Sequence, residues 1–467
     1  MAGPSLKIIQ RQPPQRPADP VEIALYEAAA KIHPRAVSGW FAAWRWALVW
    51  ATQLAFYGTA WLTWNERQAV LFDIAQRKFY IFGLVFWPQD IIYLTVLLIV
   101  SALSLFLFTA VAGRLWCGYA CPQTVYTEIF MWLEQKIEGD RNARVKLDKE
   151  TFTFKKLLLK AEKHGLWIAL SLWTGFTFVG YFTPIRELSA EVTAFTTGPW
   201  ESFWILFYGF ATYGNAGWMR DQVCTYMCPY ARFQSAMFDQ DTMVITYDRA
   251  RGEPRGKFSG KRAGLGDCID CSICVQVCPT GIDIREGLQY QCIGCAACID
   301  GCDQVMDRVG KPQGLIRYAT THAMEGKPTR ILRTRVLIYF SLLTGIVAAA
   351  SVALYLRVPL KVDVIRDRTA IAREAAGGRI ENIYRLQIMN TTESPRVFEI
   401  AAAGLPTLQL ASEPRVLIGA TESRMVPVRV RVDPALVPAG SHRIAFSIRA
   451  IDDGRVSVDE KSVFIVR

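Results

Sequence analysis

The sequence predicts a multi-domain membrane protein with three parts: an α-helical bundle of five apolar spans, a cysteine-rich domain inserted before the last span, and a C-terminal all-β sandwich. Three observations support this prediction. Apolar runs of membrane-spanning length recur over residues 40–356, all twelve cysteines fall in four tight groups, and residues 357–467 alternate apolar and polar residues. Hydrophobic residues make up 51% of the 467 residues and charged residues only 20%, which is unusual for a soluble protein.

Five segments are apolar enough and long enough to cross a bilayer, which requires about 20 residues. The first has Trp at both ends, as at a membrane interface, and its Arg45 is expected to reach the membrane surface. The fourth is the weakest, because it is short and contains Glu201 and Asn215. The predicted spans are 40–64, 91–112, 166–185, 200–218 and 336–356.

Basic loops orient these spans. Loop 113–165 contains ten Lys or Arg and loop 220–335 contains sixteen, whereas loop 65–90 contains three. Membrane proteins collect basic residues in cytoplasmic loops, so the N-terminus and both basic loops are predicted to be cytoplasmic. An odd number of spans then places the C-terminus outside. All twelve cysteines lie on the reducing side, as expected for clustered rather than disulfide-bonded cysteines.

Composition sets the domain boundaries. Residues 1–39 are polar and Pro-rich without a signal-peptide pattern, and are expected to form a flexible cytoplasmic arm. Residues 40–235 contain four spans, 236–335 form the cytoplasmic cysteine-rich domain, and 336–356 form the fifth span. Short alternating strands over 357–467 predict an immunoglobulin-like sandwich outside the membrane, without Cys and with one His. We expect this domain to be a non-catalytic interaction module.

Eight cysteines form two matching runs with C-x2-C-x2-C-x3-C spacing, over 268–278 and 292–302. This is the spacing of bacterial ferredoxins that hold two [4Fe–4S] clusters, in which the fourth cysteine of each run binds the cluster of the other run. The predicted ligands are Cys268, Cys271, Cys274 and Cys302 for the first cluster, and Cys292, Cys295, Cys298 and Cys278 for the second.

Zinc is the alternative occupant of these runs, because repeated C-x2-C pairs also form zinc ribbons. Two matching four-cysteine runs are more specific than a lone pair, and they favour iron–sulfur clusters. One residue departs from the ferredoxin pattern, since Asp303 rather than Pro follows Cys302. This departure leaves the number of ligands unchanged.

The other four cysteines form an internal repeat. Cys117 and Cys121 follow the second span in a CxxxCP motif, and Cys224 and Cys228 follow the fourth span in another. Pro favours the first turn of a helix, so the second cysteine of each motif is predicted to be a helix N-cap, where the helix dipole would lower its pKa. In a continuous helix, positions i and i+4 would share a face. Either geometry brings the two sulfurs of a pair together.

Three interpretations of these pairs stay open. Soft thiolates select Cu(I), and Met227 adds a thioether beside the second pair. Alternatively, each pair cycles between dithiol and disulfide. The third interpretation is a buried structural role, because free Cys is among the most frequently buried residues. Duplication of the motif at one membrane depth argues against this third interpretation.

Other features give weaker signals. His33 and His164 precede spans and His322 lies in a basic loop, so each is expected to be interfacial or solvated rather than a metal ligand. The net charge of +11 and the basic run 249–262 are attributed to anionic lipid, with 249–262 a solvated linker and no nucleic acid bound. The sequence has no dinucleotide-binding motif, so no nicotinamide cofactor is expected.

Together, the five spans, two CxxxCP motifs, eight-cysteine block and outer β domain resemble the FixG/RdxA/CcoG family, accessory proteins for assembly of the cbb3-type haem–copper oxidase. The similarity is clearest in C-I-D-C-S-I-C-V-Q-V-C-P from Cys268 and in Q-Y-Q-C-I-G-C from Gln289. The resemblance implies a bacterial inner-membrane cupric reductase, in which electrons from the clusters reduce Cu(II) to Cu(I). By matching motif, the copper ligands would be Cys117, Cys121, Cys224 and Cys228.

The expected partners are membrane lipid, an unidentified cytoplasmic electron donor, and a copper chaperone, a copper-exporting ATPase or oxidase assembly factors; the chain could also form a homodimer.

Two other functions stay open. One is a quinol-linked electron conduit, similar to the membrane ferredoxins of nitrate and nitrous oxide respiration, which also carry CxxxCP repeats. The other is a non-catalytic scaffold in which the clusters only stabilise the fold.

Overall fold

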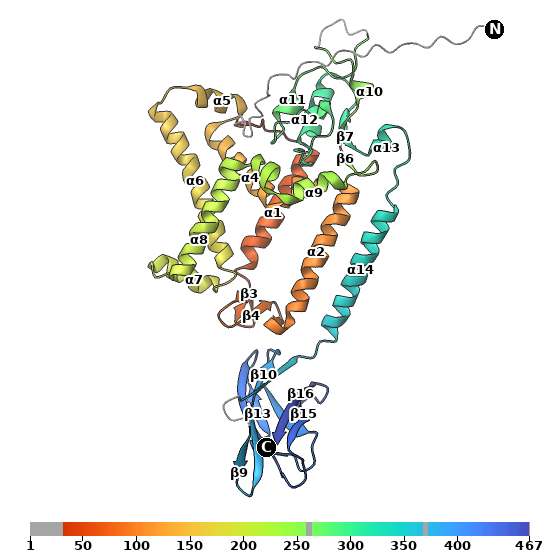
Figure 1. The fold of residues 1–467 in the computed structure, drawn as a ribbon. Coiled ribbons are helices and arrows are strands. Elements are labelled where there is room, and N and C mark those ends of the chain that lie inside the picture. Colours follow the sequence, from red (N-terminus) through yellow and green to blue (C-terminus); the bar gives the residue numbers. More distant parts are fainter. Residues whose placement is uncertain (1–30, 258–263, 368–371, 467) are drawn as a thin grey trace, which may run out of the picture.

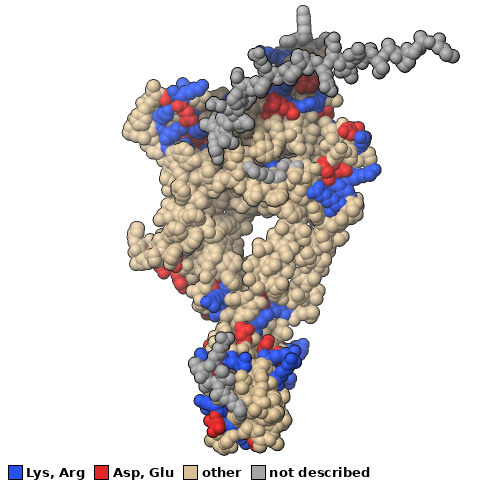
Figure 2. Space-filling model, viewed as in Figure 1, with Lys and Arg blue, Asp and Glu red and all other residues tan. Residues whose placement is uncertain are grey.

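The computed structural model describes residues 31–257, 264–367 and 372–466. The molecule is elongated and has three layers, with the cysteine-rich domain at one end, the helices in the middle and the β domain at the other end (Figure 1). Figure 2 shows Lys, Arg, Asp and Glu gathered mainly at the two ends, whereas the helical layer is mostly uncharged on this face. A bilayer around the middle layer would favour this distribution.

Each predicted span coincides with a helix, although several bounds differ. Among the described residues, two helices are long and apolar enough to cross a membrane: Pro88–Ala112 and Thr334–Tyr355, with mean hydropathies of 2.7 and 2.2. The helix that contains most of the third predicted span begins and ends earlier than the span does, because the Thr153 side chain caps a helix that starts at Phe154, and this helix stops before Gly180. The helices of this layer are α1 (Trp40–Thr59), α2 (Ile91–Ala112), α6 (Phe154–Val179), α7 (Ile185–Ala194), α8 (Pro199–Thr212) and α14 (Thr334–Tyr355).

Small residues bring α6 and α8 together. A Cβ at Gly175 of α6 would overlap the carbonyl oxygen of Ile205 in α8 and lie 3.0 Å from the nitrogen of Gly209. Glycine at such positions allows membrane helices to approach closely. On the other side of the molecule α2 packs along α14, where the Tyr93 hydroxyl donates to the carbonyl of Ala353 at 3.3 Å.

The connections that follow α2 and α8 differ in conformation although both carry a CxxxCP motif. After α2, a short α-helix leads into a second, longer one, whereas after α8 the chain is π-helical. The fourth predicted span, 200–218, is therefore α-helical only as far as Thr212. π-Helical turns often occur at functional sites. The elements are α3 (Leu115–Tyr119), α4 (Pro122–Glu138) and α5 (Arg141–Lys149), then η2 (Tyr213–Met219), η3 (Val223–Met227) and α9 (Pro229–Met237).

The cysteine-rich domain has a small core beneath the two cysteine runs. Strand β6 pairs antiparallel with β7, and Ile245 and Met306 are buried there. Residues 249–252 form a short helix in this domain, and Arg251 pairs with Asp267 at 2.6 Å, so the prediction of a solvated linker over 249–262 is wrong for these four residues. The elements are β6 (Val244–Tyr247), α10 (Arg249–Gly252), α11 (Ile273–Gln276), η4 (Ile284–Glu286), α12 (Ala297–Arg308), β7 (Ile316–Ala319) and α13 (Thr321–Met324).

Residues 31–39 lie against this end of the molecule. The Arg35 N–H donates to the carbonyl of Gln276 at 2.7 Å, and Lys31 pairs with Asp148 at 2.9 Å. The prediction of a flexible arm over 1–39 is therefore wrong for its last nine residues. The first thirty lie outside the described residues.

The C-terminal domain is a two-sheet sandwich, as predicted. One sheet has the order β12-β14-β10-β8, with β9 beside β10, and the other has the order β13-β11-β15-β16. Tyr384, Phe398, Phe446 and Phe464 fill the space between the sheets. The strands are β8 (Leu360–Arg366), β9 (Arg373–Ala375), β10 (Arg379–Asn390), β11 (Arg396–Ala403), β12 (Gln409–Leu410), β13 (Arg415–Ile418), β14 (Ser423–Val432), β15 (Gly440–Ala450) and β16 (Ser457–Val466).

Residues 65–90, predicted only as a loop, form short hairpins that contact the β domain. The first hairpin also includes Thr63 and Trp64, so the end of the first predicted span, 40–64, is not helical. Leu71, Tyr80 and Trp87 share a buried cluster with Met389 of β10. Polar contacts reinforce this interface, including that of Arg67 with Glu393 at 2.7 Å. The elements are β1 (Thr63–Trp64), β2 (Arg67–Gln68), β3 (Val70–Asp73), β4 (Lys78–Ile81), β5 (Leu84–Phe86) and η1 (Pro88–Asp90).

Candidate iron–sulfur and thiol site

The two predicted ligand sets line two separate small cavities, which we name the first and second cluster cavities. The crossed arrangement is present in space: Cys302 lies with the first run and Cys278 with the second. Cys274 touches both cavities, so the two sites adjoin. The cysteines of the first cavity are Cys268, Cys271, Cys274 and Cys302, and those of the second are Cys278, Cys292, Cys295 and Cys298.

The two cysteine loops share one backbone conformation. Asp270 and Ser272 have φ values of 50° and 56°, and their equivalents Gly294 and Ala296 have values of 70° and 59°. When residues in the left-handed backbone conformation alternate with residues in the right-handed one, successive backbone N–H groups point into the same concave space. Such concavities, called nests, bind anionic groups in iron–sulfur sites. Helices α11 and α12 start directly after Ser272 and Ala296. Both loops therefore fit a cluster with thiolate ligands.

Two buried arginines flank the second cluster cavity. Arg45 donates to the carbonyl of Cys295 at 2.7 Å, and Arg114 donates to those of Tyr290 and, at 3.4 Å, Cys292. Their Nε atoms have no hydrogen-bond partner among the described residues. Arg45 has the Glu128 carboxylate at 3.8 Å, whereas no carboxylate among the described residues pairs with Arg114. Buried cations require anionic partners, and an iron–sulfur cluster with four thiolates is anionic. The residues therefore fit [4Fe–4S] groups. The predicted reach of Arg45 to the membrane surface is wrong, because α1 packs against α12.

Both CxxxCP motifs have the predicted capping geometry. Cys121 is the N-cap residue of α4 and Cys228 that of α9, and Pro follows each one. Cys117 lies in α3 and Cys224 in η3. In each motif one thiol therefore precedes a helix and the other lies in the turn before it.

Cys117 lies directly beside the second cluster cavity. A Cβ at Gly118 would lie 2.8 Å from backbone atoms of Gly294 and Cys295, so only glycine allows this approach. The Cys117 side chain packs into the cluster of buried residues that contains Cys295. Its thiol donates to the Gln234 side-chain oxygen at 3.4 Å. The first CxxxCP motif is thus in contact with the second cysteine run.

The buried thiols of these motifs favour the protonated state. Burial raises the pKa of Cys117 to about 12 and that of Cys224 to about 11. Burial also raises the pKa of Cys121, although nearby backbone N–H groups act in the opposite direction. The predicted lowering of the pKa by the helix end is therefore wrong for Cys121. A metal ion must displace these protons to bind.

Two neighbouring cavities lie beside the second motif, and a thiol of that motif lines the smaller one. The smaller, about 130 Å³, is lined in part by Cys224, Cys295 and Asp221. The larger, about 410 Å³, shares Arg220 and Asp221 with it and extends between α4, α6 and η2. Its remaining polar lining is mostly basic: Lys31, Lys160, Lys163, His164 and Gln222.

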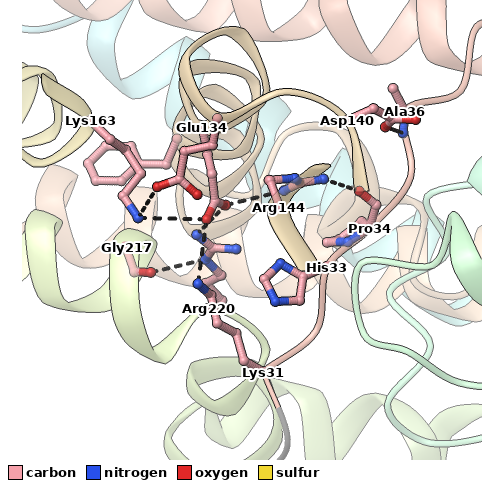
Figure 3. Close-up of polar contacts among 12 residues, drawn as sticks. Lys31, His33, Pro34, Ala36, Glu134, Asp140, Arg144, Lys163, Gly217 and Arg220 are labelled. Atoms are coloured by element: carbon pink, nitrogen blue, oxygen red, sulfur yellow. Dashed lines mark hydrogen bonds and ion pairs between the residues drawn. The ribbon is translucent and has the colours of Figure 1, made fainter. Parts of the chain in front are cut away.

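A buried ion-pair network supports the second motif (Figure 3). The fully buried carboxylate of Glu134 in α4 lies 2.8 Å from Arg220, 3.3 Å from Arg144, and 3.8 Å from both Lys163 and Lys31. Burial alone would raise the pKa of Glu134, but Arg220, Lys163 and Arg144 lower it overall. The network joins α4, α5, α6 and the turn after η2. Arg220 in this turn lies four residues before Cys224.

His33, His164 and His322 are partly exposed, and each has a polar partner. In the described part of the chain, no three His, Cys, Asp or Glu side chains are grouped to hold a single metal ion. The contacts are His33 with Asp148 at 3.3 Å, His164 with Tyr213 at 3.0 Å, and His322 with Asp241 at 2.8 Å.

Sequence reasoning missed several residues of this site. Glu134 stands on the buried face of α4 with Phe130, and a charge on such a face could have indicated a buried ion pair. Arg114 and Arg220 each precede a CxxxCP motif by a few residues, so the repeat extends beyond the cysteines. Gln234 carried no signal, because its role depends on α9 folding back over Cys117.

Three family models match this chain. A 4Fe-4S dicluster domain covers residues 219–321, a 4Fe-4S binding domain covers 94–139, and an Ig-like fold at the C-terminal of FixG covers 350–467. The second match contains the first CxxxCP motif. The third covers the β sandwich.

Whole-chain relatives agree with these matches. The chain is 36% identical to Nitrogen fixation protein FixG of Rhizobium meliloti, over 87% of each chain, and 39% identical to Protein RdxA of Cereibacter sphaeroides, over 92% of this chain and 95% of RdxA. Ferredoxin-type protein NapH of Haemophilus influenzae is 22% identical over 44% of this chain and 66% of its own length. The chain therefore belongs to the FixG/RdxA family of iron–sulfur electron-transfer proteins.

Proposed function

We propose that this protein is a cupric reductase, a membrane-bound iron–sulfur protein that reduces Cu(II) to Cu(I) for assembly of the cbb3-type cytochrome c oxidase. One observation carries the proposal. Cys117 of the first CxxxCP motif packs against the second cysteine run, where Gly118 lies against Gly294 and Cys295. A metal ion bound to Cys117 would lie next to a one-electron carrier.

The chemistry requires soft ligands next to an electron source. When bound, the [4Fe–4S] clusters store and release one electron each. Cys117, Cys121, Cys224 and Cys228 serve as copper ligands and give up their protons as the ion binds. Cu(II) takes up one electron and becomes Cu(I), which prefers thiolates, so binding of the product favours reduction.

In a variant of this proposal, the thiols are the immediate reductant. One CxxxCP pair loses two electrons and two protons to form a disulfide, and two Cu(II) ions become two Cu(I) ions. Two electrons and two protons, with the electrons from the cytoplasmic donor, then restore the dithiol. Both versions require both cysteines of a pair.

Replacing Cys117 and Cys121 by Ser tests both versions. Dithionite-reduced protein is mixed anaerobically with Cu(II) and a chelator that absorbs on binding Cu(I). We expect wild-type protein to form Cu(I) and the variant to lose this reaction, with its cluster absorbance unchanged. Wild-type rates in the double variant would refute both versions.

We also propose that all five helices cross the inner membrane, with the clusters cytoplasmic and the β domain periplasmic. In Figure 1, α1, α6 and α8 run through the same layer as α2 and α14, which supports this topology. Alkaline phosphatase is active only outside the cytoplasm. Fusions at the C-terminus should therefore be active, and fusions in loop 113–165 inactive.

The proposed partners follow from this topology. Reduced copper would pass to a copper chaperone, a copper-exporting ATPase or an oxidase assembly factor, and an unidentified cytoplasmic donor would reduce the clusters. The β domain would serve as an interaction module outside the membrane.

The NapH similarity supports a second candidate, a quinol-linked electron conduit. A conduit should show cluster reduction by a quinol analogue without copper, and no Cu(II) reductase activity. A scaffold would show neither cluster reduction by quinol nor cluster oxidation by Cu(II). A reductase should show cluster oxidation by Cu(II).

A further inference from the structure

Arg114 occupies an unusual position between the second cluster cavity and the two CxxxCP motifs. It lies three residues before Cys117 and is only 6% exposed. One guanidinium nitrogen donates to the carbonyls of Tyr290 and Cys292 in the second cysteine run. Another donates to the carbonyl of Ala231 in α9, the helix that Cys228 caps. One side chain therefore bridges the cluster loop and both thiol motifs.

Arg114 also lacks the carboxylate partner that other buried arginines have. Arg144 and Arg220 pair with Glu134, and Arg357 pairs with Asp90. Within residues 31–257, 264–367 and 372–466, no carboxylate lies within ion-pair distance of Arg114, and its Nε has no hydrogen-bond partner. All its bonds go to neutral carbonyls.

A buried charge without an anionic partner is costly. Thiols able to become anionic lie on both sides: Cys292, whose carbonyl Arg114 binds, lines the second cluster cavity, and Cys117 of the first CxxxCP pair is three residues along the chain. A cluster bound by four thiolates carries net negative charge, and this charge grows by one unit on reduction. The buried guanidinium therefore interacts more favourably with the reduced state.

We propose that Arg114 is a positioning residue that raises the reduction potential of the second cluster and holds its loop against the thiol motifs. Local charge and hydrogen bonding are established determinants of iron–sulfur potentials. A higher potential at the second cluster directs electrons from the first cluster toward the thiols. The inference deepens the proposed electron-transfer function; it depends on the clusters being bound but not on copper as the acceptor.

The test is a redox titration of the purified full-length protein without copper, followed by electron paramagnetic resonance. In Arg114→Gln we expect the potential of one cluster to shift to a more negative value while the other stays at its wild-type value. Arg285→Gln is the matched control, because Arg285 lines the first cluster cavity and pairs with Asp270 and Asp283. In Arg285→Gln, the cluster whose potential shifts in Arg114→Gln should keep its wild-type potential.

Arg114→Lys separates charge from hydrogen bonding and serves if the Gln variant fails to fold. Lysine keeps the positive charge but lacks the planar guanidinium group whose N–H groups donate to the three carbonyls. We expect a near wild-type potential but slower electron transfer to copper. Unchanged potentials in Arg114→Gln, equal shifts of both clusters, or a Lys variant with the potential expected of the Gln variant would each overturn the inference. If the wild-type protein fails to reduce Cu(II) while Arg114→Gln still shifts the potential of one cluster, the proposed function alone would be contradicted and this inference would stand.

Discussion

At the scale of single residues, contact between the thiol motif and the cluster loop depends on the missing side chain of Gly118. A Cβ there would lie 2.8 Å from the backbone of Cys295, closer than real Cβ atoms approach. Neither partner can yield easily, because both contacting surfaces are backbone. This contact explains why a glycine stands immediately after Cys117.

We predict that Gly118→Ala destabilises the protein by about 1–3 kcal/mol through overpacking and reduces the iron bound in the second cavity. Iron and sulfide analysis together with thermal unfolding would measure both effects. Gly165→Ala in α6 is the control, because a Cβ there would meet no atom within 4 Å. If both variants retain full iron content and stability, the contact is looser than the structure indicates.

The buried thiols lead to a pH prediction. The pKa values of Cys117 and Cys224 are about 12 and about 11, so these thiols are protonated at neutral pH, and copper must displace their protons. Burial raises the pKa of both Cys117 and Cys121, so binding to this pair should release about two protons, and its affinity for Cu(I) should therefore rise about a hundredfold per pH unit. Competition titrations with a Cu(I) chelator between pH 6 and 8 would measure the slope. An affinity independent of pH would show that the ligands are already thiolates.

At the scale of elements, the network around Glu134 holds four segments together. Its carboxylate joins α4 to α5 through Arg144, to α6 through Lys163, and to the turn before η3 through Arg220. Because η3 carries Cys224, this network fixes the second motif relative to the first, which directly precedes α4. The arrangement places a structural ion-pair network directly beneath the thiols.

Glu134→Ala should destabilise the protein by about 3–5 kcal/mol, because it leaves several cations buried without their partner. Thermal or denaturant unfolding in detergent would measure the loss. Glu150→Ala is a suitable comparison, since its pair with Lys146 is exposed and such pairs contribute about 0–1 kcal/mol. Equal stability of the two variants would contradict the importance of the buried network.

At the scale of the whole molecule, a second ion-pair site joins the helical layer to the β domain. Asp90 precedes α2 and is buried, with Arg357 at 2.5 Å and Lys361 at 3.1 Å on the chain that leaves α14. The hairpins over 63–90 also bury Leu71 and Trp87 against Met389. The outer domain is therefore docked rather than suspended on a linker.

We predict that Asp90→Ala releases this docking, at a cost of about 3–5 kcal/mol, because Arg357 loses its buried partner. Hydrogen exchange should increase in β8 and in the hairpins, while the cysteine-rich domain should keep its protection. The exposed pair of Asp453 and Arg455 provides the control, and Asp453→Ala should leave exchange unchanged. Unaltered protection in Asp90→Ala would show that apolar contacts suffice.

The sequence by itself determined the parts of this protein and their order. Cysteine spacing, apolar runs and strand alternation are local patterns set by ligand number, bilayer thickness and the two-residue period of a strand. They predicted the crossed cysteine sets, a helix at each span and the sandwich.

Only the tertiary structure decided how these parts meet. Arg45 was expected at the membrane surface, and Arg114 and Glu134 gave no clear signal, because burial depends on partners distant in sequence. The pKa of Cys121 was predicted in the wrong direction for the same reason, since burial outweighs the local effect of a helix end. Contacts such as that of Gly118 with Cys295 join residues more than 170 positions apart, and no local pattern records them.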